Sequence, residues 1–175
     1  MAIAVKPLPH PDAHHLRAAH GWLELGNHIE ASNELERIKP RLRAHPEVLE
    51  IRYAIFQHAK KWDACVDIAS DMVTALPGNP HGWILRSFAL HELKRTREAF
   101  DYLLPSAVTF PEVWTIPYNL ACYCAQLGEI AKSREWFNKA LAIDKKTVRH
   151  AALNDPDLLP LWAGTKGDPQ SLPPT

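Results

Sequence analysis

The residues best suited to chemistry are two cysteines, Cys122 and Cys124, which stand one residue apart in the stretch IPYNLACYCAQLGEI, residues 116 to 130. Paired thiols can bind a metal ion or take part in redox reactions. On a helix, at about 100° per residue, these two side chains would point about 200° apart and could not converge on one ion unaided. Free cysteine is also a common small buried hydrophobe. The alternative to a thiol site is packing, and the surrounding elements decide between them.

Other patterns that could carry chemistry are weaker. The chain has ten histidines, and HPDAHH at residues 10 to 15 suggests metal binding. No HExxH motif or paired CxxC spacing accompanies it, so a polar tail is the favoured interpretation. The sequence also lacks a glycine-rich phosphate loop, a nucleophile motif and an acid pair spaced for general acid and base catalysis. We therefore predict a protein that is not an enzyme and that has no cofactor or metal site.

The composition predicts one soluble domain and favours proteins over nucleic acids as its partners. The 175 residues are 46% hydrophobic, enough for one domain with a substantial core. No apolar run approaches the roughly 20 residues that cross a bilayer, and the start MAIAVKPLPHPDAHH lacks the pattern of an export signal. Twenty basic and twenty acidic residues cancel, which argues against nonspecific nucleic-acid binding. Three cysteines make a disulfide framework improbable, so we expect a cytoplasmic location.

The chain repeats itself with a period of 34 residues. One series, at the centre of each copy, is Gly26, Lys60, Lys94 and Gly128. A second series, five residues later, holds only small side chains: Ala31, Cys65, Ala99 and Ser133. Small residues at one register suit the close crossing of two helices, because larger side chains would force the backbones apart.

Four repeats follow from this period, at residues 12–45, 46–79, 80–113 and 114–147, and they account for 136 of the 175 residues. Within each repeat the apolar spacing is helical with a break near the middle, which predicts helix, turn, helix. Pro77 and Pro111 fall at the same register, where proline ends the second helix. The sequence therefore predicts an all-α fold.

These features resemble the tetratricopeptide repeat family, whose units are 34-residue helix pairs. The fourth repeat matches the family pattern best, through Leu120, Ala121, Gly128, Phe137 and Ala140. The resemblance implies a right-handed superhelical α-solenoid of four helix pairs with a C-terminal capping helix. Two positions depart from it, because Arg52 and Arg86 stand where the family usually has leucine.

The ends of the chain have other predicted roles. Residues 1–11 and 164–175 are rich in proline and glycine and are expected to be flexible tails. Residues 148–163 are expected to form a capping helix and an apolar anchor, since the last repeat of an array exposes an apolar face. The side chains expected to cover that face are Ala151, Ala152, Leu153, Leu158, Leu159, Leu161 and Trp162.

The resemblance also implies a partner-binding groove lined by the first helix of each repeat. We call the following the predicted groove residues: Leu16, His20, Glu50, Arg52, Ala54, Gln57, His58, His81, Ile84, Arg86, Phe88, His91, Tyr118, Asn119, Cys122 and Ala125. Solvated surface histidines, and arginines paired with residues such as Glu50 or Glu92, are the alternatives to a binding role. The register places Cys122 in this groove and Cys124 in the core.

The function implied is a non-enzymatic scaffold that binds other proteins. The lysine and asparagine clamp that some family members use for chaperone tails is absent, because His20, His81, Leu16 and Leu85 occupy its positions. The chain resembles the group of small bacterial kinesin light chains, which implies binding to bacterial tubulin filaments and bridging of protofilaments. A chaperone or adaptor for a secreted or other peptide-bearing client is the alternative.

Overall fold

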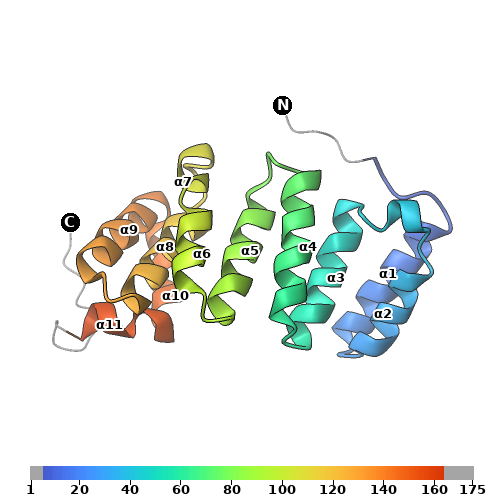
Figure 1. Ribbon diagram of the computed structural model, residues 1–175, viewed down its shortest axis with the longest axis horizontal. Coiled ribbons are helices and arrows are strands. Elements are labelled where there is room, and N and C mark those ends of the chain that lie inside the picture. The colour runs from blue at the N-terminus through green and yellow to red at the C-terminus, as the bar shows by residue number, and fades with distance from the viewer. Residues whose placement is uncertain (1–5, 164–175) are drawn as a thin grey trace. The chain divides into compact units, whose positions relative to one another are not determined.

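The computed structural model describes residues 6–163, and the chain divides into two compact units with the boundary between Ala89 and Leu90, inside helix α5 (Pro80–Glu92). We call them the N-terminal and the C-terminal unit and describe each by itself. Every regular element within residues 6–163 is a helix, which confirms the predicted all-α fold class (Figure 1). None of these helices is both long and apolar enough to span a membrane.

The N-terminal unit contains two helix pairs and the first part of a third. Its elements are α1 (Asp12–Glu24), α2 (His28–Glu36), the short η1 (Pro40–Leu42), α3 (Pro46–His58), α4 (Trp62–Ala75) and the start of α5 (Pro80–Glu92). One core cluster joins Leu8 to residues of α1, α2 and α3. The other joins α3, α4 and α5, and Tyr53 at its centre donates a hydrogen bond to the Leu85 carbonyl at 3.0 Å.

The C-terminal unit is built around one buried helix. After the end of α5 come α6 (Thr96–Leu103), α7 (Ser106–Thr109), α8 (Thr115–Gln126), α9 (Ile130–Ile143), α10 (Lys145–Ala152), η2 (Pro156–Leu158) and α11 (Leu159–Trp162). Nine of the twelve residues of α8 are buried, because α6, α9, η2 and α11 all pack against it. Consequently α8 is the element whose side chains the rest of this unit positions.

The 34-residue period is visible in the backbone. The second helices begin at His28, Trp62, Thr96 and Ile130, each 34 residues after the last. The predicted turn residues just before them all adopt positive φ: Gly26 at 75°, Lys60 at 53°, Lys94 at 63° and Gly128 at 76°. One left-handed residue in each repeat thus reverses the chain between the paired helices.

The small-residue series lies where the sequence predicts it. Ala31, Cys65, Ala99 and Ser133 are each 0% exposed. In two repeats the side chain also bonds to the partner helix: Ser133 Oγ donates to the Ala121 carbonyl at 2.8 Å, and Cys65 Sγ lies 3.9 Å from the Tyr53 carbonyl oxygen. This register therefore forms the close helix contact of each pair.

Changing the residue at the left-handed turn should change stability in a predictable direction. Lys60→Gly should raise the free energy of unfolding by about 0.5–1 kcal/mol, because glycine reaches positive φ without the clash that a Cβ causes. Gly26→Ala, at the same register, should lower it by about 1 kcal/mol, although no heavy atom lies within 4 Å of the added methyl. Urea unfolding followed by circular dichroism measures both. Changes of the same sign in the two variants would contradict this account.

The ends differ in part from the sequence-based expectation. Leu8 is buried in the first core cluster and the backbone carbonyl of Lys6 lies 2.8 Å from His45 Nε2, so residues 6–11 have fixed contacts where a flexible tail was expected. Of the side chains expected to cover the last repeat, Ala152, Leu158 and Leu161 are buried, whereas Leu153 and Leu159 are exposed. The expected tails at 1–5 and 164–175 lie outside the described residues.

Candidate functional site

In the N-terminal unit the predicted groove residues remain accessible to solvent to different degrees. The exposed ones are His20, Glu50, Gln57, His58 and His81. The half-buried ones are Leu16, Arg52, Ala54, Ile84, Arg86 and Phe88. A polar rim beside partly covered apolar side chains is a common composition for a protein-binding surface.

Several of these side chains also have structural contacts. Arg52 lies 3.4 Å from Glu36 Oε1, so its ion pair is with the preceding repeat rather than with Glu50 or Glu92. Phe88 packs edge-on against Trp62, with ring centroids 5.7 Å apart. The Arg52 pair is half-exposed, where such pairs contribute little to stability. The basic ladder of Arg52 and Arg86 therefore stays a prediction, and Arg52 already has an ion-pair partner within its own chain.

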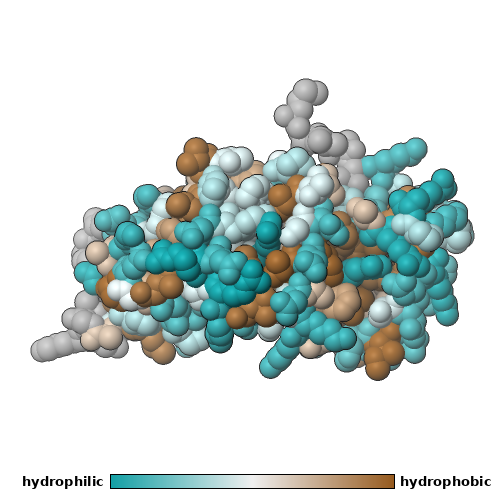
Figure 2. Space-filling model, in the orientation of Figure 1, coloured by the Kyte–Doolittle hydropathy of each residue, from teal (hydrophilic) through white to brown (hydrophobic). Residues whose placement is uncertain are grey.

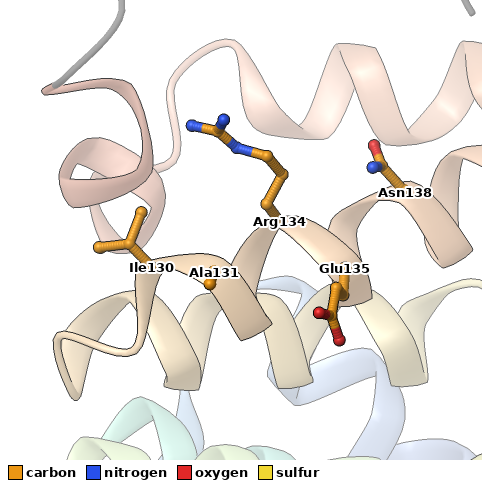
Figure 3. Close-up of a pocket in the computed structure, with 5 residues that line it drawn as sticks. All are labelled: Ile130, Ala131, Arg134, Glu135 and Asn138. Carbon is orange, nitrogen blue, oxygen red and sulfur yellow. The ribbon is translucent and has the colours of Figure 1, made fainter.

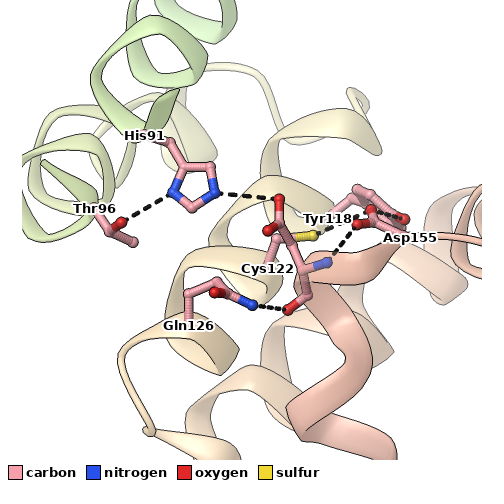
Figure 4. Close-up of polar contacts among 7 residues, drawn as sticks. His91, Thr96, Tyr118, Cys122, Gln126 and Asp155 are labelled. Atoms are coloured by element: carbon pink, nitrogen blue, oxygen red, sulfur yellow. Dashed lines mark hydrogen bonds and ion pairs between the residues drawn. The ribbon is translucent and has the colours of Figure 1, made fainter. Parts of the chain in front are cut away.

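The C-terminal unit is different, because its predicted groove residues are covered. His91 and Tyr118 are each 6% exposed, Cys122 is 4% exposed and Ala125 is 2% exposed, while Asn119 is half-buried. The covering element is the chain itself: η2 and the preceding Asp155 lie against α8 (Figure 4). Residues 155–158 of the chain itself therefore contact several of the predicted groove residues in this unit, and partner binding by these residues stays a prediction.

The carboxylate of Asp155 holds one end of this segment. Its Oδ2 accepts a hydrogen bond from Tyr118 Oη at 2.6 Å and lies 3.7 Å from Cys122 Sγ (Figure 4). Its Oδ1 accepts from the Asp157 amide at 2.9 Å, which caps η2. Asp155 thus shapes the turn and binds α8 with the same side chain.

Asp157 holds the other end of the segment. Its Oδ2 lies 3.2 Å from His91 Nε2, and its carbonyl accepts from Gln126 Nε2 at 2.9 Å. Since an ionised carboxylate can only accept, Nε2 of His91 is the donor. The other nitrogen, Nδ1, lies 3.0 Å from Thr96 Oγ1, and the ring packs 5.1 Å from the Tyr123 ring. The contacts with Thr96 and Tyr123 therefore fix the orientation of the His91 ring independently of the segment.

The electrostatics of the site keep its thiol and phenol protonated. Burial, followed by the negative charge of Asp155, raises the pKa of Cys122 well above its ordinary value. Burial and the hydrogen bond to Asp155 likewise raise the pKa of Tyr118 far above its ordinary value. A protonated thiol is a poor nucleophile and a poor metal ligand. Cys122 therefore acts here as a buried donor.

The second cysteine belongs to the core, as its register predicts. Cys124 is 1% exposed, and burial raises its pKa to about 11. Cys65 is fully buried with its pKa also raised to about 11 by burial. Among the described residues, no group of three or more histidine, cysteine, aspartate or glutamate side chains is arranged to hold a metal ion. The cysteine pair is accounted for by packing and by the contact to Asp155.

The contact between Asp157 and His91 should make stability depend on acid pH. The His91 hydrogen bond holds the pKa of Asp157 below its ordinary value. The ionised Asp157 carboxylate therefore contributes its full stabilisation of the folded state at pH values above its pKa in the unfolded chain, about 3.9. That stabilisation is lost as the pH falls through the lower pKa of Asp157 in the folded state. The difference in free energy of unfolding between wild type and Asp157→Asn should shrink as the pH is lowered from 5.5. Urea titrations at several pH values test this, and Asn154→Ala should give a difference that does not change with pH.

Two other surface features indicate no specific ligand. A shallow hollow of about 450 Å³ lies along α9 and is lined by Ile130, Ala131, Arg134, Glu135 and Asn138 (Figure 3). One cation and one anion from a single helix give it no preference for a charged ligand. Single apolar residues are also exposed, among them Val108 on α7 and Ile29 on α2. Figure 2 shows apolar residues as separate brown areas among polar ones on the face that it draws.

Three residues of the covered site were missed in the sequence: Gln126, Asp155 and Asp157. Gln126 could have been found, because it stands two periods after His58, which the same register had placed in the groove. The Asp-Pro-Asp sequence at 155–157 was a further signal, since two carboxylates on a short turn are unusual in a segment expected only to supply apolar cover. The position of this segment against α8 depends on tertiary contacts, which the 34-residue repeat pattern does not predict.

Comparison with known proteins supports the fold. A scan against protein-family models and a search of curated proteins each found no match. Solved structures do match. MamA from Desulfovibrio magneticus RS-1 superposes with a TM-score of 0.70 and 15% identity, over 83% of this chain and 83% of that one. TTC0263, a thermophilic TPR protein from Thermus thermophilus, gives 0.64 and 20%, over 80% and 78%. Pseudomonas aeruginosa PilF gives 0.66 and 20%, over 79% of this chain and 64% of its own. The chain therefore has the fold of tetratricopeptide repeat proteins.

Proposed function

We propose that this chain is a non-enzymatic scaffold that binds segments of other proteins through the predicted groove residues. The observation that carries the proposal is the covered site of the C-terminal unit. There, side chains at groove positions bind a short turn of four residues, Asp155 and the 3-10 helix η2, through a set of directed hydrogen bonds. Residues 31 to 66 positions away in sequence make these contacts, so the segment is held as a ligand would be.

The N-terminal unit supports the same function with positions that remain accessible. Glu50, Gln57 and His81 are exposed, and half-buried Ile84 and Phe88 offer apolar contact. Partner segments commonly bury a few apolar anchors and place polar groups at the rim. Binding there would use accessible surface that the fold already provides.

Site-specific photo-crosslinking tests the function in the full chain. A photoreactive phenylalanine analogue is placed at Glu50 or His81, and in matched variants at Asp67 or Asp71, which are exposed on α4. After illumination in native lysate, we expect a discrete crosslinked protein from the first pair and none from the second. Crosslinks from α4 alone would contradict the groove. Failure of all four variants to crosslink would contradict the scaffold function.

A narrower form of the proposal comes from the resemblance to bacterial kinesin light chains, in which the partner is polymerised bacterial tubulin. The names of the structural neighbours reported above do not mention tubulin, so this partner is a hypothesis from the sequence alone. Cosedimentation is the test: the chain should pellet with filaments in proportion to polymer mass. Recovery at the level of the filament-free control would end this hypothesis while leaving the wider one standing.

A further inference from the structure

The covered site of the C-terminal unit selects its occupant by chemistry. Four side chains that hydrogen-bond to the segment are His91, Tyr118, Cys122 and Gln126 (Figure 4). In these contacts all four are donors, so the occupant must supply acceptors at matching positions. The chain's own segment supplies the carboxylates of Asp155 and Asp157 and one backbone carbonyl.

Charge and apolar contact narrow the choice further. Lys94 adds a positive charge close enough to lower the pKa of Asp157 further, after the larger effect of His91. Leu158, directly after the second aspartate, is fully buried. The site therefore suits an occupant with two carboxylates separated by one residue and followed by leucine. The positive charge of Lys94, which belongs to the site, favours the second carboxylate.

The polar residues of the segment are also accessible enough for a partner segment to replace them. The side chain of Asp157 is 37% exposed, Asn154 and Pro156 are exposed, and η2 contains only three residues. By contrast, α11 anchors the chain beyond the segment through Leu161 and through Trp162, whose ring lies 5.4 Å from that of Phe137. The segment can therefore leave α8 while the chain stays attached on its far side.

We infer that the surface formed by His91, Tyr118, Cys122 and Gln126 is a binding site for an acidic partner segment of the pattern Asp-x-Asp-Leu, and that residues 155–158 are its internal competitor. The inference rests on the proposed function and names its partner class in the C-terminal unit. A partner segment would bind as the chain's own turn does, and only when that turn has moved away.

Thiol modification of the full-length chain tests this exchange, because Cys122 lies under the segment and Cys124 lies in the core of the same helix. The variant is Asp155→Ala with Asp157→Ala, and the reagent is N-ethylmaleimide with readout by peptide mass spectrometry. We expect modification of Cys122 to become at least tenfold faster than in wild type, and that of Cys124 to stay unchanged. Asp157→Asn alone is the second variant, with a smaller increase expected.

The probe is a synthetic peptide with the sequence of residues 154–159, NDPDLL, blocked at both ends. It should slow modification of Cys122 in the double variant back toward the wild-type rate, and the same peptide with both aspartates replaced by asparagine should not. Equal acceleration at Cys122 and Cys124 would mean that the segment is only structural, and would overturn the inference. Absence of protection by the acidic peptide would also overturn it, and crosslinking at Glu50 or His81 would then show that the wider function survives.

Discussion

Replacing Phe137 with alanine should lower the free energy of unfolding by about 3–5 kcal/mol. Phe137 is 1% exposed, and its ring lies 6.3 Å from that of Tyr118 on α8 and 5.4 Å from that of Trp162 on α11. Its loss would leave a cavity between α9 and the two elements that hold the candidate site. Urea unfolding of the full chain, followed by circular dichroism, measures the effect.

The control for Phe137→Ala is Asn138→Ala, one residue along the same helix. Asn138 is exposed, so its replacement should change the free energy of unfolding by no more than about 0.5 kcal/mol. The Phe137 variant should also speed modification of Cys122, because α11 would lose its aromatic partner. A loss below about 1.5 kcal/mol would contradict the packing described for this unit.

The second large effect is expected at Gly82, where α5 crosses α4 at close range. A Cβ there would lie 2.9 Å from the Val73 backbone nitrogen and 3.1 Å from Met72 Cβ. Backbone atoms cannot move aside as a flexible side chain can, so Gly82→Ala should lower the free energy of unfolding by about 1–3 kcal/mol. Differential scanning calorimetry would register this as a fall in melting temperature.

Gly21→Ala is the matched control for Gly82→Ala, because Gly21 lies inside α1 and no heavy atom stands within 4 Å of the added methyl. Alanine is the better helix former, so this variant should gain about 0.5–1 kcal/mol. Replacing glycine with alanine is thus expected to raise the free energy of unfolding at position 21 and to lower it at position 82. A stabilised Gly82→Ala would mean that α4 and α5 are not as close as described.

The repeating part of the molecule could be predicted from the sequence because its causes are local. The 34-residue period locates the turns, and a residue with positive φ sits at each one, whether glycine or lysine occupies it. The small series is buried in all four copies for the same reason. Each of these features depends on contacts within one helix pair, which the periodic pattern describes.

The candidate site could be predicted only in part because its decisive contacts are distant in sequence. The register placed Tyr118, Cys122 and His91 in one groove, and the structure brings them together. It did not indicate that residues 155–158 cover them, since that depends on where the chain turns after α10. Burial of Leu8 was missed for the same reason, because residues near a chain end show no periodicity.

The two cysteines illustrate both outcomes. Cys124 occupies the core position that its register predicts, and its burial leaves no thiol chemistry to assign. Cys122 is at the groove position, but it contacts Asp155 of its own chain instead of solvent or a partner. The rate at which Cys122 is modified therefore reports whether residues 155–158 cover it.

The most direct measurement of the central claim is the affinity of the crosslinked partner, once identified, for two matched sets of exposed residues. Replacing Glu50, Gln57 and His81 together with alanine should weaken binding at least tenfold, while leaving the folded state intact. Replacing Asp63, Asp67 and Asp71 on α4 in the same way should leave the affinity within twofold of wild type. Unchanged affinity in the first set, together with a loss in the second, would contradict binding through the predicted groove residues.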